Sequence, residues 1–262
     1  MADRSYYFGI ASYNRLERQH ILKLLNSMGY EKDEILLALQ TKKDYEEYSE
    51  RYGDMATILY KEGSNCCYNK NTILDYVVEN LNNTRVVMLS DKVKGIVYKT
   101  RKGELREVKT KYELDRLVKI AFLLTKKMGA EVFGCCTVSN KLFMRNSIST
   151  NQQVLGCFMG ILNPSLQKFD VEQPLKEDFE FILRHIANGR KTIRFNDVGL
   201  KETLHTKGGS YELWHNIEEC RRCNDRLLEL YPNLVTRHST RKNEQRYIGE
   251  TKVYNTSIVD YL

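Results

Sequence analysis

Hydrophobic and polar residues alternate along the first third of the chain in a way that predicts strands separated by helices. Apolar runs predict buried strands at 6–11, 35–39, 56–60 and 85–89. Apolar residues also recur every three to four positions before Gly29 and again before Leu81, which predicts amphipathic helices. Strands that alternate with helices indicate a parallel α/β sheet, whose ligands bind beyond the carboxyl ends of the strands. The polar residues at those ends therefore define the candidate site.

The middle of the chain predicts a β-hairpin, because extended runs at 94–100 and 104–110 flank Arg101-Lys102-Gly103. Further strands are expected at 132–138, 154–162 and 191–195. Further helices are expected at 112–128, 177–189 and 211–230. The chain has only 3 prolines and no stretch rich in proline, glycine and serine that would act as a linker, so we predict a single domain over 1–262.

Composition narrows the class of protein. Of the 262 residues, 42% are hydrophobic and 29% are charged, which is typical of a folded, water-soluble protein and excludes a fibre or a disordered tail. No apolar run approaches the roughly 18 residues of a membrane span, so no membrane partner is expected. The 7 cysteines lie mostly in apolar runs and predict free thiols in a reducing, cytoplasmic setting. Cys220-x-x-Cys223 lacks the second pair that a zinc site of this type needs.

Positive charge is concentrated in one window of the sequence. The chain carries 41 basic and 34 acidic side chains, a net charge of +7, and residues 92–111 contribute eight basic and two acidic residues of these. Such a window is either a solvated hairpin or a platform for the phosphate backbone of DNA, which supplies most of the nonspecific affinity. The cations expected to contact DNA are Lys94, Lys99, Arg101, Lys102, Arg106 and Lys109.

The motifs of several common enzyme classes are missing, since the sequence has no Walker loop, GxGxxG, HExxH or GxSxG. The remaining motifs are ambiguous when taken singly. Ser12 and Arg15 after the first strand suit an anion, or they begin a helix. Asp91 suits a metal or a ribose, or it forms a turn. Glu177-Asp178 suit a general base, or they complement a helix dipole.

The order of these segments is more specific than any one of them. The chain carries Ser12-Tyr13-Asn14-Arg15, Gln40 to Asp44, Gly63-Ser64-Asn65 with Asn69-Lys70-Asn71, VVMLSDK, Glu177-Asp178 and Gly208-Gly209. This succession resembles the nucleotide-sugar glycosyltransferases of the GT-A fold. It is most similar to the small bacteriophage members that glycosylate hydroxymethylated DNA bases, and the resemblance is strongest over 5–95 and 155–210. The resemblance implies an α/β fold with a mostly parallel central sheet flanked by helices, into which the basic β-hairpin is inserted.

The resemblance also implies roles for single residues. A half at 1–92 would bind the donor, a UDP-sugar, through Ser12, Tyr13, Arg15, Gln40, Asp44, Gly63, Asn65, Lys70, Asn71, Asp91 and Lys92. A half at 93–262 would bind the acceptor, whose hydroxyl Asp178 would deprotonate with Glu177 beside it. Asp91 lies where the family carries the acidic motif that holds Mg²⁺ or Mn²⁺. His205 lies where such folds often supply a late metal ligand.

One departure from the family pattern affects the metal. Where the pattern reads three acidic residues, this chain reads Ser90-Asp91-Lys92. A hard cation needs oxygen ligands, so the loss of two carboxylates argues against the usual metal site. We expect Lys92 to take over part of the metal's role by neutralising the leaving diphosphate. The other interpretation is a degenerate, inactive copy.

The expected function is transfer of a hexose, which we expect to be glucose, from a UDP-sugar to a hydroxyl of a hydroxymethylated pyrimidine in double-stranded DNA. The configuration at the anomeric carbon is expected to invert. The pyrimidine is either bare or already glucosylated. Two alternatives stay open: a glycosyltransferase for a saccharide, lipid or protein acceptor, and a non-catalytic DNA-binding protein on a decayed GT-A scaffold. A phage enzyme of this kind would act in the cytoplasm of the host.

Overall fold

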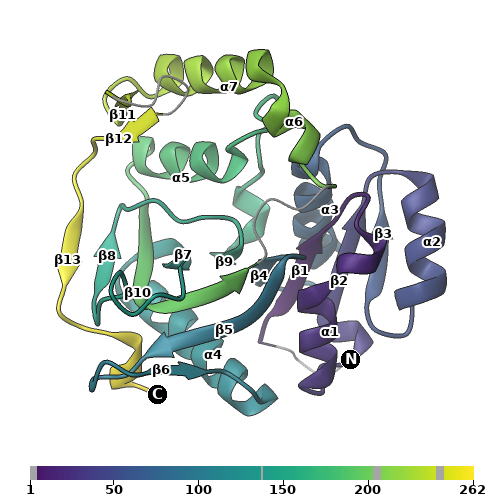
Figure 1. Cartoon of the computed structure of the whole chain (residues 1–262), viewed down its shortest axis with the longest axis horizontal. Coiled ribbons are helices and arrows are strands. Elements are labelled where there is room, and N and C mark those ends of the chain that lie inside the picture. Colours follow the sequence, from purple (N-terminus) through teal and green to yellow (C-terminus); the bar gives the residue numbers. More distant parts are fainter. Residues whose placement is uncertain (1–4, 137, 203–207, 240–244) are drawn as a thin grey trace.

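One large sheet forms the middle of the molecule, with helices on both of its faces (Figure 1). The structure is a computed structural model that describes residues 5–136, 138–202, 208–239 and 245–262. Parallel strands make one half of the sheet, from the middle to one edge, in the spatial order β4 (Arg85–Ser90), β1 (Tyr7–Ala11), β2 (Ile35–Leu39) and β3 (Thr57–Tyr60). The apolar run of β2 is buried along its whole length, because helices cover both faces of this part of the sheet.

The other half of the sheet is mixed. β9 (Phe158–Leu162) runs antiparallel to β4 and to β7 (Ala130–Cys136). β10 (Lys191–Glu202) lies parallel to β7 and then pairs antiparallel with β5 (Val93–Lys99). The far edge is formed by β8 (Ile148–Thr150) and β13 (Lys252–Tyr254). The expected parallel sheet is therefore confirmed at the centre, whereas antiparallel strands extend it.

Each face of the sheet is covered by its own helices. One face packs against α1 (His20–Ser27), α2 (Lys42–Tyr52) and α4 (Lys111–Lys127), and the other against α3 (Cys66–Glu79) and α5 (Glu177–Ala187). Phe8 of β1 lies in the first apolar core and its neighbour Tyr7 in the second, as the alternation of side chains along a strand requires. Within the described ranges, no helix combines the length and the apolar character needed to cross a bilayer.

A further layer lies over α5, at the top of Figure 1. It contains α6 (Tyr211–His215), α7 (Ile217–Leu230), and the paired strands β11 (Val235–Arg237) and β12 (Gln245–Tyr247). Leu183 of α5, Leu227 of α7 and Val235 of β11 are buried together and form its apolar contact with α5. Short 3-10 turns occur at η1 (Leu16–Arg18), η2 (Lys32–Glu34), η3 (Pro164–Leu166) and η4 (Ile258–Asp260).

Some elements depart from the sequence prediction. The hairpin is present, since β5 pairs with β6 (Leu105–Glu107), but β5 also pairs with β10 and so belongs to the main sheet. The helix expected at 211–230 breaks at Asn216, whose side chain accepts from the amides of two following residues and caps α7. The sequence pattern does not predict α2, because most of its residues are polar and only Asp44, Tyr48 and Tyr52 are buried.

Candidate active site

Polar side chains gather at the carboxyl ends of the central parallel strands, where ligands bind in this class of fold. Ser12 follows β1, Gln40 follows β2, and Asp91 follows β4. These strand ends form one edge, because β1 lies between β2 and β4. All three side chains are buried at this edge, as is Arg15 in the turn after β1. The structure thus brings together several residues that the resemblance assigns to the donor.

Arg15 is the centre of a buried polar network. Its Nη1 donates to Asp91 Oδ1 at 2.9 Å, and its Nη2 donates to the carbonyl oxygen of Gly208. Asp91 Oδ2 accepts from Ser12 Oγ at 2.9 Å. Burial raises the pKa of Asp91 above its usual value, although Arg15 and Ser12 act in the opposite direction. Since breaking a buried ion pair leaves an uncompensated charge, this network fixes the positions of both partners.

Other residues that the sequence analysis missed hold the turn after β1. The backbone amide of Arg15 donates to the hydroxyl of Tyr48 at 3.0 Å. Gln19 Nε2 donates to Ser12 Oγ at 2.7 Å, and Asn69 Nδ2 donates to the carbonyl of Ser12 at 2.9 Å. These side chains come from three separate segments, and hydrophobic periodicity carries no signal for a buried polar residue. Only the three-dimensional arrangement identifies them.

The segment at Gly208-Gly209 closes over this turn. Gly209 N donates to the carbonyl of Tyr13 at 2.8 Å, and both glycines have a positive φ, +85° and +60°. A Cβ on Gly208 would lie 2.4 Å from the carbonyl oxygen of Asn14, and one on Gly209 would lie 2.7 Å from the Arg15 guanidinium. Only glycine therefore fits at either position, for reasons of both space and backbone conformation.

The acidic pair Glu177-Asp178 begins α5. Lys70 Nζ donates to Glu177 Oε1 at 2.6 Å, and both side chains are largely buried. The half-buried Asp178 accepts from the backbone amides of Gly156 and Phe179, each at 2.9 Å. Burial and then the charge of Glu177 raise the pKa of Asp178 to about 6, against the effect of Lys70 and the two amides. Glu177 is thus neutralised by a lysine, while Asp178 has the proton affinity expected of a general base near neutral pH.

The acidic pair and the Arg15 network lie at neighbouring strand ends. Ser90 N, at the end of β4, donates to the carbonyl of Cys157 at 3.1 Å, and Cys157 directly follows the Gly156 that binds Asp178. Glu202, which the sequence analysis did not single out, ends β10 close enough to Lys92 and Asp91 for their charges to act on its pKa. Burial raises the pKa of Glu202, and its Oε1 is buried with no hydrogen-bond partner among the described residues.

The amides of Asn65 and Asn71 form hydrogen bonds within the protein. Asn65 Oδ1 caps α3, and its Nδ2 donates to the carbonyl of Val171 at 2.9 Å. Asn71 forms hydrogen bonds with both backbone groups of Phe169, at 2.7 and 2.9 Å. These amides bind α3 to the segment before α5, and their expected contacts with the nucleotide and sugar stay a prediction. Short sequence motifs do not reveal partners that lie about a hundred positions away.

The other residues assigned to the donor differ in their exposure. Tyr13 and Lys92 are partly exposed, and the buried Asp44 accepts weakly from the Asn14 amide at 3.4 Å. Gln40 is buried, and its Oε1 has no hydrogen-bond partner in the described part of the chain. Gly63 packs against the ring of Tyr68, where a Cβ would clash at 2.5 Å.

The acidic residues described by the structure do not fit a divalent cation. Asp91, the expected ligand, already has one oxygen bound by Arg15 and the other by Ser12. His205, the second expected ligand, lies outside the described residues. Within the described ranges, no three His, Cys, Asp or Glu side chains cluster in a way that would hold a metal. Mg²⁺ and Mn²⁺ need several oxygen ligands, so we derive no step through a metal.

The cations of the basic hairpin divide into two groups. Lys94, Lys102, Arg106 and Lys109 are exposed. Arg101 forms an ion pair with Asp260 instead, and Lys99 Nζ donates to two backbone carbonyls. Arg106 also pairs with Glu104 at 4.0 Å, so three of the six cations expected to contact DNA have partners within the protein.

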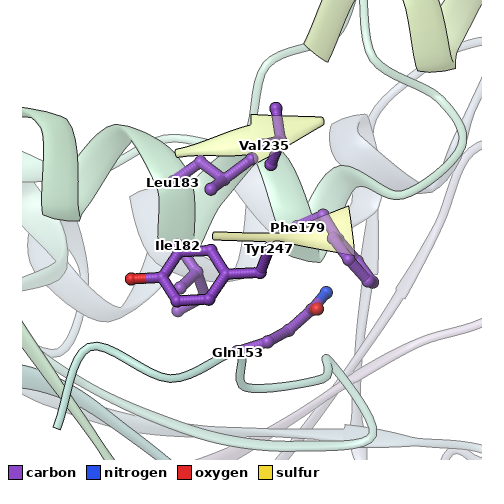
Figure 2. Close-up of a pocket in the computed structure, with 6 residues that line it drawn as sticks. All are labelled: Gln153, Phe179, Ile182, Leu183, Val235 and Tyr247. Atoms are coloured by element: carbon purple, nitrogen blue, oxygen red, sulfur yellow. The ribbon is translucent and has the colours of Figure 1, made fainter. Parts of the chain in front are cut away.

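One apolar cavity lies away from this edge of the sheet, between α5 and the strands β11 and β12. Figure 2 shows Phe179, Ile182 and Leu183 of α5 facing Val235 and Tyr247, with Gln153 closing the cavity from below. Its volume is only about 10 Å³. This is about the space of one water molecule, so the cavity is a small void between packed side chains and is too small to bind a nucleotide sugar.

The model of one protein family matches residues 9–209, a span that contains the Arg15 network and the acidic pair. Its description is TET-associated glycosyltransferase. The chain belongs to this family. It is therefore a glycosyltransferase, and the resemblance drawn from the order of its motifs is confirmed. No curated protein sequence shows significant similarity to it.

Solved structures confirm the GT-A fold. The 1–349 fragment of S. aureus TarS, also solved in complex with UDP, aligns with a TM-score of 0.50 at 12% identity, over 86% of this chain and 66% of that one. GalNAc-T7 with UDP, GalNAc and Mn²⁺ aligns with a TM-score of 0.52 at 8% identity, over 78% of this chain and 45% of that one. At such low identity the likeness concerns the fold, and this glycosyltransferase spans only part of either relative.

Proposed function

We propose that this glycosyltransferase transfers a hexose, namely glucose, from a UDP-sugar to a hydroxyl of a hydroxymethylated pyrimidine in duplex DNA. The observation that carries the proposal is Asp178, a half-buried carboxylate with a pKa near 6 beside the carboxyl end of β4. The family supports the reaction type. TarS and GalNAc-T7, which share the fold, have both been solved with UDP, and this favours the same donor class here.

The donor would bind across the strand ends of residues 1–92. Gln40 supports this placement, because a buried amide oxygen without a donor costs free energy that a nucleobase N–H would offset. Lys92 is partly exposed next to Asp91 and Glu202, where its ammonium would neutralise charge on the diphosphate. Arg15 and Ser12 would act less directly, by holding Asp91 and the turn in place.

The acceptor would approach from residues 93–262. Asp178 takes the proton of the acceptor hydroxyl, and the oxygen attacks the anomeric carbon from the side opposite the diphosphate. The bond from that carbon to the diphosphate oxygen breaks, UDP leaves with the electron pair, and the configuration inverts. The ion pair between Lys70 and Glu177 supports this assignment. Lys70 lies at hydrogen-bond distance from Glu177, so Asp178 is the acid that stays available as a base.

The function is tested by incubating the protein with UDP-glucose and duplex DNA that contains cytosine, hydroxymethylcytosine or glucosylated hydroxymethylcytosine. We expect a mass increase of one hexose on a hydroxymethylated nucleoside and none on cytosine. Transfer to a saccharide or a peptide but to none of the DNAs would contradict the acceptor. Binding of DNA with no hydrolysis or transfer of any UDP-sugar would favour a non-catalytic protein instead.

The role of Lys92 predicts that wild-type activity survives saturating EDTA. A positioned ammonium supplies the positive charge that a metal ion would supply, so Lys92→Met should lower kcat at least tenfold. Lys126→Met, at an exposed lysine on α4, is the control and should not lower it. An absolute requirement for Mn²⁺ or Mg²⁺ in the wild-type reaction would show that this role is wrong.

A further inference from the structure

The loop between β7 and β8 displays adjacent apolar side chains to solvent. Leu142 is 80% exposed and Phe143 is 69% exposed. Lys141 and Arg145, which flank them, are exposed as well. The chain contains no acidic residue between Glu131 and Asp170, so the loop lies in a long basic and neutral stretch. Neighbouring apolar side chains that are exposed together often mark an interaction site.

The exposed pair belongs to an ordered turn. Asn140 Oδ1 accepts from the amide of Leu142 at 3.0 Å, and its carbonyl accepts from the amide of Phe143 at 3.0 Å. Met144 is fully buried, so the chain returns to the core directly after the exposed pair. A fixed turn presents its side chains at a lower cost in conformational entropy than a flexible one does.

The basic hairpin clamps this loop. Lys99 Nζ, at the end of β5, donates to the carbonyls of Lys141 at 2.9 Å and Met144 at 2.8 Å. Asn146 Nδ2 donates back to the carbonyl of Lys99 at 3.2 Å. The loop and the hairpin are therefore one surface. An open groove of about 470 Å³ runs along it, lined by Arg106, by Lys109 and by Ser139 at the start of the loop. Lys201 and Glu107 line it as well and form an ion pair with each other at 2.9 Å.

This surface continues toward the candidate active site. The loop crosses β10 at Gly199, where a Cβ would touch the carbonyl of Val138 and the side chain of Met144. Gly199 is three residues before Glu202, which neighbours Asp91 and Lys92. The exposed pair lies further away, beside Lys99, which is six residues of β5 or roughly 20 Å from Val93 at the site. A duplex lying along the groove is long enough to reach both the loop and the site.

We propose that Leu142 and Phe143 form a wedge that inserts into the base stack of the acceptor DNA while the groove cations hold its phosphates. The proposal rests on the proposed function, because it takes duplex DNA as the acceptor. Apolar side chains flanked by basic ones unstack base steps in many DNA-binding proteins. Unstacking of the duplex would let the modified pyrimidine leave the helix and bring its hydroxyl toward Asp178, whose side chain is half-buried.

The test compares the wild type with L142A/F143A. We expect at least a tenfold loss of kcat/KM on duplex DNA containing hydroxymethylcytosine and less than a twofold change on the single-stranded oligonucleotide, which needs no unstacking. Leu123→Ala, which truncates a 62% exposed leucine on α4, is the matched control and should change neither rate. Phe143→Trp keeps a flat apolar side chain and should keep most of the duplex activity.

A second readout needs no transfer. 2-Aminopurine placed beside the hydroxymethylcytosine should brighten when the wild type binds the duplex, and L142A/F143A should abolish the brightening. Equal duplex rates or equal brightening in the two proteins would overturn the wedge, as would a wild type that does not bind DNA. A wild type that sediments as a dimer while L142A/F143A sediments as a monomer would overturn it too, because the pair would then contact a second copy of the chain. Brightening without transfer to either form of DNA would instead refute the proposed function and leave the wedge standing.

Discussion

Two aspartates at the candidate site differ in their electrostatic surroundings. Asp91 has both oxygens bound, by Arg15 and Ser12, and so serves as an anchor for the turn after β1. Asp178 accepts from the backbone amides of Gly156 and Phe179, one at each oxygen, and its side chain is half-buried. Carboxylates with such different surroundings can take different roles, one structural and one catalytic.

Replacing Asp178 with asparagine removes the proposed base and keeps the shape of the side chain. We expect kcat to fall by about 10²- to 10⁴-fold, the range typical of general bases, while the affinity for UDP measured by calorimetry stays within twofold. Glu172→Gln, at an exposed acid shortly before α5, is the control. Full activity of Asp178→Asn would rule out this assignment.

The raised pKa of Asp178 also predicts the pH dependence. A base works only when it is deprotonated, and burial together with Glu177 raises its pKa to about 6. The value of kcat/KM should therefore be constant above about pH 7 and fall about tenfold per pH unit below about pH 6. Stopped assays of sugar transfer from pH 4.5 to 8.5 would measure this, and a profile flat down to pH 5 would contradict it.

At the scale of elements, the site depends on how distant segments meet. The apolar runs and the polar ends of β1, β2 and β4 are readable in the sequence, as is the start of α5, because periodicity and strand order follow from local patterns. The partners of Asn65 and Asn71 are not readable, because their amides bind the backbone of a segment about a hundred positions away. Glu202 was missed for the same reason, since only the length of β10 brings it to Asp91.

The Gly208-Gly209 segment offers a test of this long-range packing. Gly209→Ala adds a Cβ that would lie 2.7 Å from the Arg15 guanidinium, at a φ of +60°. Gly129→Ala is the matched control, because Gly129 has a φ of +66° and nothing within 4 Å of the added atom. We expect urea unfolding to show a loss of about 1 kcal/mol for the control, from backbone strain alone.

The loss for Gly209→Ala should be larger, about 2–3 kcal/mol, and its affinity for UDP should fall as well, since the clash displaces Arg15. Equal losses for the two variants, with unchanged UDP affinity, would show that the contact between Gly209 and Arg15 does not shape the site.

At the scale of the whole molecule, charge is distributed unevenly. Arg106 and Lys109 of the hairpin line one groove, whereas Lys42 and Lys43 of α2 form local pairs with acidic residues of the same helix. If DNA lies in the groove, the salt dependence of its binding must come from the groove cations and not from the lysines of α2. The net charge of +7 alone does not distinguish them.

A triple variant, K102Q/R106Q/K109Q, should therefore weaken duplex binding. Each phosphate contact contributes about 0.9 to the slope of log Kobs against log salt, so the slope should become shallower by roughly 3. K42Q/K43Q removes exposed lysines of α2 and should leave the slope unchanged. Fluorescence anisotropy between 50 and 300 mM salt measures both, and an identical loss in the two variants would mean that DNA binding is not confined to the groove.

The hydrogen bond from Arg15 to the carbonyl of Gly208 has a consequence for biosynthesis. The two residues are 193 positions apart, yet the bond completes the network at the end of β1. At the usual 5–20 residues per second, a ribosome needs roughly 10 to 40 s to make the chain between them. During that time the strands that carry the proposed donor contacts are present without the segment that closes over them. A nascent chain that ends before Gly208 therefore carries an unfinished site, and catalysis must begin only after Gly208 has been translated.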